Sequence, residues 1–194
     1  HALGNVAVFD TASRMPGEKI SFAMNQRLPE DIKIVDSREV EQTFHPRKRR
    51  CRKVYEYRIL NTIHPVPMYR LFSYFYYWKL DVGRMKEAAA YLVGEHDFRS
   101  FCSIGSQALT TVRTVRQVEI RKDEKTNIIT VHIEGDGFLY NMVRIIIGTL
   151  LEIGGGKYPP EEMKKILEAR NRDMAGPTAP ARGLTLVGMT YEDD

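Results

Sequence analysis

One arginine lies within the most apolar stretch of the chain. Arg144 is flanked by Met142 and Val143 on one side and by Ile145–Ile147 on the other. Burying a guanidinium is costly unless an anion satisfies it, so this pattern predicts a carboxylate, a phosphate or a chain terminus as its partner. The alternative is an arginine whose long side chain reaches solvent. We favour a site residue that pairs with an acid.

Two tyrosines, Tyr55 and Tyr57, alternate along a strand-like segment that directly follows a dense run of positive charge. Paired tyrosines in a strand more often pack in the core or across strands than take part in catalysis. Beside clustered basic side chains, however, aromatic rings suit a surface that stacks a nucleotide base while it holds phosphates. These tyrosines are therefore the second candidates for a site.

The basic run is dense, although the net charge of the whole chain is only +4. A local concentration of positive charge attracts a polyanion such as RNA. This density favours a nucleic-acid contact over a solvated linker. The run consists of Arg47, Lys48, Arg49, Arg50, Arg52 and Lys53.

The sequence lacks the motifs of nucleotide-binding loops, zinc proteases and serine hydrolases. Its five histidines are dispersed, and Cys51 and Cys102 show no metal-binding spacing. The glycines at 154–156 follow a helical pattern, where glycine ends a helix, so they do not indicate a phosphate-binding loop. We therefore expect no metal and no nucleotide or other cofactor.

The elements that must position these residues alternate between helical and extended patterns. Helices scattered among antiparallel strands predict an α+β fold, with a mixed, mainly antiparallel sheet and helices packed on it. The apolar spacing predicts helices over 19–28, 82–93, 138–153 and 161–171. It predicts strands over 31–40, 54–60, 72–78, 111–121, 128–134 and 184–191.

A chain of 194 residues that is 43% hydrophobic can bury an ordinary core. No apolar segment reaches the roughly 20 residues needed to cross a bilayer, and the amino end has no secretion-signal pattern. We expect a cytoplasmic protein that does not bind membranes.

Five segments resemble, in order, the motifs of the tRNA pseudouridine synthase A family. They look like the end of the catalytic-aspartate motif, the tyrosine motif, a central helix with its turn, the arginine motif and the closing strand. In this chain they are HALGNVAVFDT (1–11), FHPRKRRCRKVYEY (44–57), LDVGRMKEAAAYLVGEHDFRSFC (80–102), GFLYNMVRIIIGTLLEIGGGK (137–157) and TAPARGLTLVGMTY (178–191).

The resemblance implies an incomplete pseudouridine synthase fold and a cofactor-free isomerisation of tRNA uridines in the anticodon stem-loop. The bond from C1′ to N1 breaks, the base rotates, and a bond from C1′ to C5 forms. It also implies a homodimer. By position, Tyr55 would stack on the target base, Arg144 would pair with the catalytic aspartate, and Leu184 would line the base pocket.

The sequence departs from the family at its start. The family's catalytic aspartate precedes a Gly-Val-His step, whereas this sequence begins at the histidine, and neither Asp10 nor Asp97 fits the motif. We therefore expect the aspartate upstream of His1. Residues 1–44 would be a remnant of the N-terminal half, 45–194 the C-terminal RNA-modifying domain, and the chain alone inactive. The alternatives are a non-catalytic RNA-binding module and a structural or interaction domain.

Overall fold

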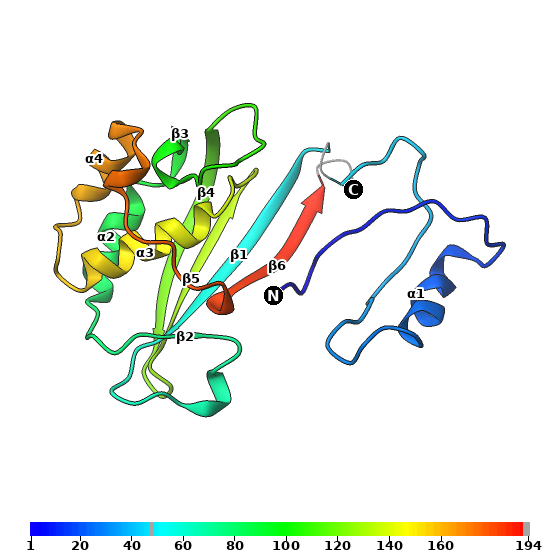
Figure 1. Ribbon diagram of the computed structural model, residues 1–194, viewed down its shortest axis with the longest axis horizontal. Coiled ribbons are helices and arrows are strands. Elements are labelled where there is room, and N and C mark those ends of the chain that lie inside the picture. Colours follow the sequence, from blue (N-terminus) through cyan, green and yellow to red (C-terminus); the bar gives the residue numbers. More distant parts are fainter. Residues whose placement is uncertain (47–48, 192–194) are drawn as a thin grey trace. The chain divides into compact units, whose positions relative to one another are not determined.

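Figure 1 shows the computed structural model of the protein, which describes residues 1–46 and 49–191. The chain forms two compact units. One contains residues 1–5 and the chain from residue 50 onward, and the other contains residues 6–49. The first unit holds the sheet and three of the helices, and the second holds the remaining helix, α1 (Gly17–Asn25).

The sheet of the first unit is mixed and mainly antiparallel, as the sequence predicts. Its strands follow the order β2-β1-β5-β4-β3, and β6 pairs with β1 as well. Only β1 and β2 run parallel among these pairs. The strands are β1 (Cys51–Leu60), β2 (Tyr74–Phe75), β3 (Gly94–Asp97), β4 (Val112–Asp123), β5 (Ile128–Gly135) and β6 (Leu184–Tyr191).

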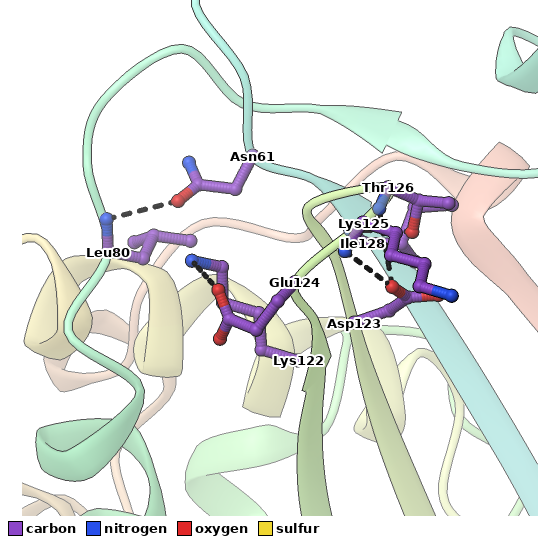
Figure 2. A network of polar contacts seen from close by, with 8 residues as sticks. All are labelled: Asn61, Leu80, Lys122, Asp123, Glu124, Lys125, Thr126 and Ile128. Atoms are coloured by element: carbon purple, nitrogen blue, oxygen red, sulfur yellow. Dashed lines mark hydrogen bonds and ion pairs between the residues drawn. The ribbon is translucent and has the colours of Figure 1, made fainter.

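The β4–β5 connection is a tight turn held by one carboxylate (Figure 2). Asp123 Oδ1 accepts hydrogen bonds from the backbone N–H groups of Lys125, at 2.8 Å, and Thr126, at 3.2 Å. Asn127 takes the left-handed conformation, with φ of 55°, which asparagine tolerates better than most residues. Near this turn, the Asn61 Oδ1 accepts from Leu80 N at 3.2 Å and so fixes the end of the long 61–80 connection.

Helices α2 (Val82–Ala90), α3 (Met142–Gly154) and α4 (Glu162–Ala169) belong to the same unit as the sheet. The Asp81 side chain caps α2 by accepting from Arg84 N, as its position before the helix predicts. Ile145, Ile146 and Leu150 of α3 are fully buried in the core. Each such side chain contributes about 1.5–3 kcal/mol through burial, so α3 is held mainly by its packing. None of the helices described is long and apolar enough to span a bilayer.

The strand predicted over residues 31–40 is wrong, because this segment pairs with no other strand. The Asn25 side chain instead hydrogen-bonds both backbone groups of Ile34, donating to its carbonyl and accepting from its N–H, each at 2.8 Å. An amide side chain thus takes the place of a neighbouring strand. Val35 remains 89% exposed, so the apolar alternation of this segment marks no buried face.

Other elements also differ from prediction. The strand expected over 72–78 is reduced to β2, and the short β3 has no apolar alternation that would reveal it. Helix α3 begins at Met142 instead of residue 138, because Asn141 has φ of 61°, which is incompatible with an α-helix. Arg144 therefore lies in the first turn of α3 and not in its middle.

Candidate functional site

The two tyrosines share one face of the sheet with two leucines of β6. Tyr55 lies opposite Leu186, and Tyr57 lies opposite Leu184. Residues directly opposite each other in an antiparallel pair point to the same side, and alternate residues of one strand do likewise. Since Tyr57 is part of the hydrophobic core together with the α3 isoleucines, this is the face that the helices cover. Tyr55 and Leu184 therefore belong to one surface.

Tyr55 lies at the edge of the core. Its side chain is partly buried and meets the Phe138 ring edge-on, with centroids 5.2 Å apart and an interplanar angle of 87°. Burial, and then the nearby Cys51, raise the pKa of the Tyr55 hydroxyl above its ordinary value, which favours the neutral phenol still further. A neutral aromatic ring that is only partly covered can stack on another planar group.

Tyr57 is fully buried and anchors the chain that leads into β6. Its hydroxyl donates a 2.7 Å hydrogen bond to the carbonyl of Pro180. Burial raises the pKa of this hydroxyl strongly, while the positive charge of Arg144 acts in the opposite direction. The backbone of Gly183 lies against the Tyr57 ring so closely that an added Cβ would come within 2.7 Å of it.

Arg144 holds the same segment from the helix side. Its Nε donates to the carbonyl of Ala179 at 2.7 Å, and its own carbonyl accepts from Ala179 N at 3.1 Å. The guanidinium and the Tyr57 hydroxyl therefore bind the consecutive carbonyls of Ala179 and Pro180. These contacts fix the start of β6, where Leu184 is located. The structure thus brings Arg144 to the same end of β6 as Leu184, near Tyr57.

The amino end of α3 carries a positive side chain and no negative one. Its first turn contains no acidic residue, and the Asn141 side chain makes no capping hydrogen bond. A cation in the first turn opposes the helix dipole by about 0.3–1 kcal/mol. Within residues 1–46 and 49–191, Arg144 forms no ion pair with a carboxylate. The electrostatics of this end favour an anion.

The first residues of the chain run parallel to β6 at its free side. The His1 amino group donates to the Leu184 carbonyl at 3.1 Å, and the His1 carbonyl accepts from Leu186 N at 3.0 Å. Ala2 and Leu186 form a parallel bridge. The His1 ring is fixed as well, with its Nε2 2.6 Å from the carbonyl of Leu71. The backbone of His1 therefore lies beside Leu184.

The residues of the basic run differ in their exposure and in their ion-pair partners. Arg47 and Lys48 lie outside the described residues. Arg49 pairs with Glu41 at 3.3 Å, and Arg50 is exposed. Arg52 and Lys53 belong to β1, where Arg52 pairs with Glu134 at 3.2 Å. Strand alternation places Lys53 on the face of Tyr55 and Arg52 on the opposite face.

Sequence reasoning missed Asn141, Phe138 and the Ala179–Pro180 carbonyls. Phe138 was assigned to a helix, although Gly135 and Gly137 nearby were a signal for irregular backbone. Carbonyl acceptors carry no sequence signal at all. Asp97, which does not fit the motif of the catalytic aspartate, accepts hydrogen bonds from the Thr111 hydroxyl and from the backbone N–H of Arg99. Among the residues that the structure covers, no three potential metal ligands cluster.

The fold is that of a pseudouridine synthase domain. Residues 88–192 match the family model described as tRNA pseudouridine synthase. They include β4, β5, α3 and the whole of β6, and thus Arg144 and Leu184. Tyr55 lies before the matched range.

Similar proteins match over nearly the whole chain. The protein named tRNA pseudouridine synthase A from Acetivibrio thermocellus is 48% identical over 191 residues, which are 98% of this chain and 78% of that protein. The protein of the same name from Syntrophomonas wolfei is 43% identical over 100% of this chain and 77% of its own length. The one from Thermoanaerobacter sp. strain X514 is 44% identical over 98% of this chain and 78% of its own length. The chain belongs to the tRNA pseudouridine synthase family, which confirms the resemblance found in the sequence.

Proposed function

We propose that this chain provides most of the active site of an enzyme that converts uridines of the tRNA anticodon stem-loop to pseudouridine. The observation that carries the proposal is Arg144, a guanidinium fixed at the amino end of α3 with no carboxylate partner among the described residues. Tyr55, whose ring is suited to stacking, and Leu184, which is suited to lining a pocket, lie on one face of the sheet, and Arg144 holds the segment that leads into Leu184.

In this proposal Tyr55 stacks on the uracil, Leu184 contacts its edge, and Arg144 pairs with the catalytic aspartate. A base must leave its stack to reach such a pocket, and aromatic contacts offset the few kcal/mol that this costs. The isomerisation exchanges a C1′–N1 bond for a C1′–C5 bond, and the proton leaves C5 and is returned to N1, so no cofactor is needed. The aspartate acts either as the nucleophile at C1′ or as the base that opens a glycal route.

We further propose that the aspartate is supplied by a segment before His1. The His1 backbone lies beside Leu184, so residues leading into it would approach the site from that side. Residues 1–44 would then be the end of an N-terminal half, and residues 45–194 the C-terminal RNA-modifying domain. The 194-residue chain alone would not modify tRNA.

The basic run is proposed to hold the phosphates of the tRNA. Arg50 is exposed and Lys53 shares the face of Tyr55, which suits a path for the RNA backbone towards the site. Because the substrate is tRNA, we place the protein in the cytoplasm. We also propose a homodimer, as in the family.

The test compares the 194-residue chain with a longer protein that carries the natural upstream segment. Unmodified tRNA is incubated with each, and pseudouridine is measured by mass spectrometry of the digested RNA after chemical labelling. We expect conversion by the longer protein only, and its loss in the Arg144→Ala variant. Turnover by the 194-residue chain would refute the placement of the acid. Salt-sensitive tRNA binding without turnover in either protein would favour an RNA-binding module, and absence of both would favour an interaction domain.

A further inference from the structure

Asn141 precedes α3 in a conformation that most residues avoid. Its φ is 61°, one of three positive values at non-glycine positions in the described chain. Asparagine at this position ordinarily caps the helix by accepting from the backbone N–H groups of the first turn. Here the side chain makes no such bond. Both the strained backbone and the missing cap require another role for the side chain.

The side chain bridges two other groups instead. Asn141 Oδ1 accepts a 2.9 Å hydrogen bond from Arg144 Nη1, and Asn141 Nδ2 donates a 3.0 Å hydrogen bond to Ser103 Oγ. The orientation of the amide is unambiguous, because a guanidinium has only donors and must face the oxygen. Ser103 also contacts Tyr140, the residue before Asn141, because Ser103 N donates to the Tyr140 carbonyl at 3.1 Å.

The guanidinium is thus fixed at two of its nitrogens. Nε donates to Ala179, and Nη1 donates to Asn141. A guanidinium has five N–H donors, so the described residues use two of the five and leave three. The three include both donors of Nη2, which no described residue uses, so a carboxylate can still be bound at this end of the guanidinium.

We infer that Asn141 is a positioning residue, which with Ser103 orients the Arg144 guanidinium so that its terminal nitrogens face the catalytic acid. The inference rests on the function proposed above. A free arginine side chain has high rotamer entropy, and fixing it costs free energy. If the side chain is already ordered in the folded protein, this cost does not arise when the acid and the substrate meet in the site. Without the bridge, the guanidinium keeps only its bond to Ala179 and rotates more freely.

The decisive variants separate the side chain from the backbone. Asn141→Gly removes both hydrogen bonds but keeps a residue that accepts positive φ without cost. The matched control is Asn127→Gly, because Asn127 has φ of 55° in the β4–β5 turn, and only its backbone groups form hydrogen bonds there. Ser103→Ala removes the outer end of the bridge alone and serves if Asn141→Gly fails to fold.

A third variant distinguishes positioning from a structural role. Asn141→Asp keeps an acceptor for Arg144 and tolerates the same backbone conformation. Its carboxylate would neutralise the guanidinium and compete with the catalytic acid. A structural role predicts that Asn141→Asp retains more activity than Asn141→Gly. A positioning role predicts that it retains less.

The first measurement uses the 194-residue chain and needs no activity. In NMR spectra of labelled arginine side chains, the guanidinium of Arg144 should rotate slowly about its Nε–Cζ bond. Rotation should become at least several-fold faster in Asn141→Gly and Ser103→Ala, and stay unchanged in Asn127→Gly. Equal rotation rates in all four proteins would overturn the inference.

The second measurement uses the longer protein with its upstream segment. We expect Asn141→Gly to lower kcat by on the order of ten- to a hundredfold with KM within about twofold, since only the orientation of the reacting groups changes. Ser103→Ala should lower kcat less and add nothing in the Asn141→Gly background. Wild-type kcat in Asn141→Gly would contradict the inference. If the wild-type protein makes no pseudouridine, the proposed function fails, and the NMR comparison still decides whether Asn141 orients Arg144.

Discussion

At the residue scale, two tyrosines of one strand face have different roles because their burial differs. Tyr57 is fully buried and its hydroxyl is used on the Pro180 carbonyl, whereas Tyr55 is only partly covered. Alternation alone treats the two as equivalent. The difference in burial separates the two tyrosines. Tyr57 has a structural role, whereas the partly exposed Tyr55 can contact a ligand.

The hydroxyl of Tyr57 provides a stability prediction. Tyr57→Phe keeps the ring in place but leaves the Pro180 carbonyl without its donor, so we expect a loss of about 1–3 kcal/mol in the free energy of unfolding. Tyr55→Phe should change it by less than about 0.5 kcal/mol. Urea unfolding curves of the two variants and the wild type make the comparison. An equal effect of both substitutions would show that the Pro180 contact contributes nothing.

At the element scale, a glycine inside α3 allows the helix to approach the chain that precedes β6. A Cβ on Gly148 would lie 1.7 Å from the Pro177 carbonyl oxygen, and Thr149 Oγ1 accepts from Gly176 N at 2.9 Å. Glycine costs a helix about 1 kcal/mol relative to alanine. This close crossing offsets that cost, because it aligns residues 176–180 for their contacts with Arg144 and Tyr57.

Gly148→Ala should therefore destabilise the protein although alanine is the better helix former. Overpacking against backbone typically costs about 1–3 kcal/mol, and this contact is severe, so we expect about 2 kcal/mol or more. Gly188→Ala in β6 is the matched control, since an added Cβ there meets nothing within 4 Å. Thermal unfolding of both variants is the measurement. A Gly148→Ala protein as stable as the wild type would mean that the crossing can open without cost.

The carboxylate of Asp97 ties β3 to its surroundings in a pH-dependent way. Burial tends to raise the pKa of Asp97, but the hydrogen bond from the Thr111 hydroxyl, the Arg99 N–H and the positive charge of Arg170 together lower it. A carboxyl with a lowered pKa in the folded state stabilises the protein above its unfolded pKa of about 3.9, and this contribution is lost as the pH falls through the folded value.

We expect Asp97→Asn to reduce the free energy of unfolding at pH 7 and to have progressively less effect below about pH 4. Denaturant unfolding at a series of pH values measures this difference. Thr111→Val should move the loss of stability to higher pH, because it removes one of the bonds that favour the charged carboxylate. A difference between wild type and Asp97→Asn that is constant down to pH 2 would contradict this account.

At the scale of the whole molecule, the hydrophobic core belongs to one of the two units. All of the fully buried apolar side chains lie between Cys51 and Tyr191. Of the described residues 6–46 and 49 in the other unit, Pro46 is the one buried residue with an apolar side chain, and Phe22 and Val35 are 73% and 89% exposed. Burial of apolar area is the main favourable term in folding, so the two units differ in stability.

Amide hydrogen exchange of the 194-residue chain should reveal this difference. We expect the amides of residues 6–46 to exchange orders of magnitude faster than those of β1, β5 and α3, whose backbone groups open only when the core does. Mass spectrometry of peptic fragments after timed exchange is the measurement. Comparable protection in α1 and α3 would show that residues 6–46 are stabilised by contacts that their burial does not explain.

Residue types and their spacing along the chain were enough to predict the class of fold, most of the sheet and helices of the core, and the residue types of the candidate site. Hydrophobic periodicity and residue type are local properties, and α2, β1, β5 and β6 could be recognised from them. The unusual position of Arg144 in an apolar run also required no coordinates. The same local rule failed for residues 31–40, where an asparagine side chain takes the place of a partner strand.

Which groups meet could be learned from the folded structure alone. It set the start of α3 at Met142 and joined Asn141 to Ser103. It also placed the Ala179 and Pro180 carbonyls under Arg144 and Tyr57. Such contacts depend on backbone carbonyls and on residues far apart in sequence, and neither is encoded in the spacing of residue types. The physical reason is that long-range hydrogen bonds are selected by packing of the whole core, after local preferences have been satisfied.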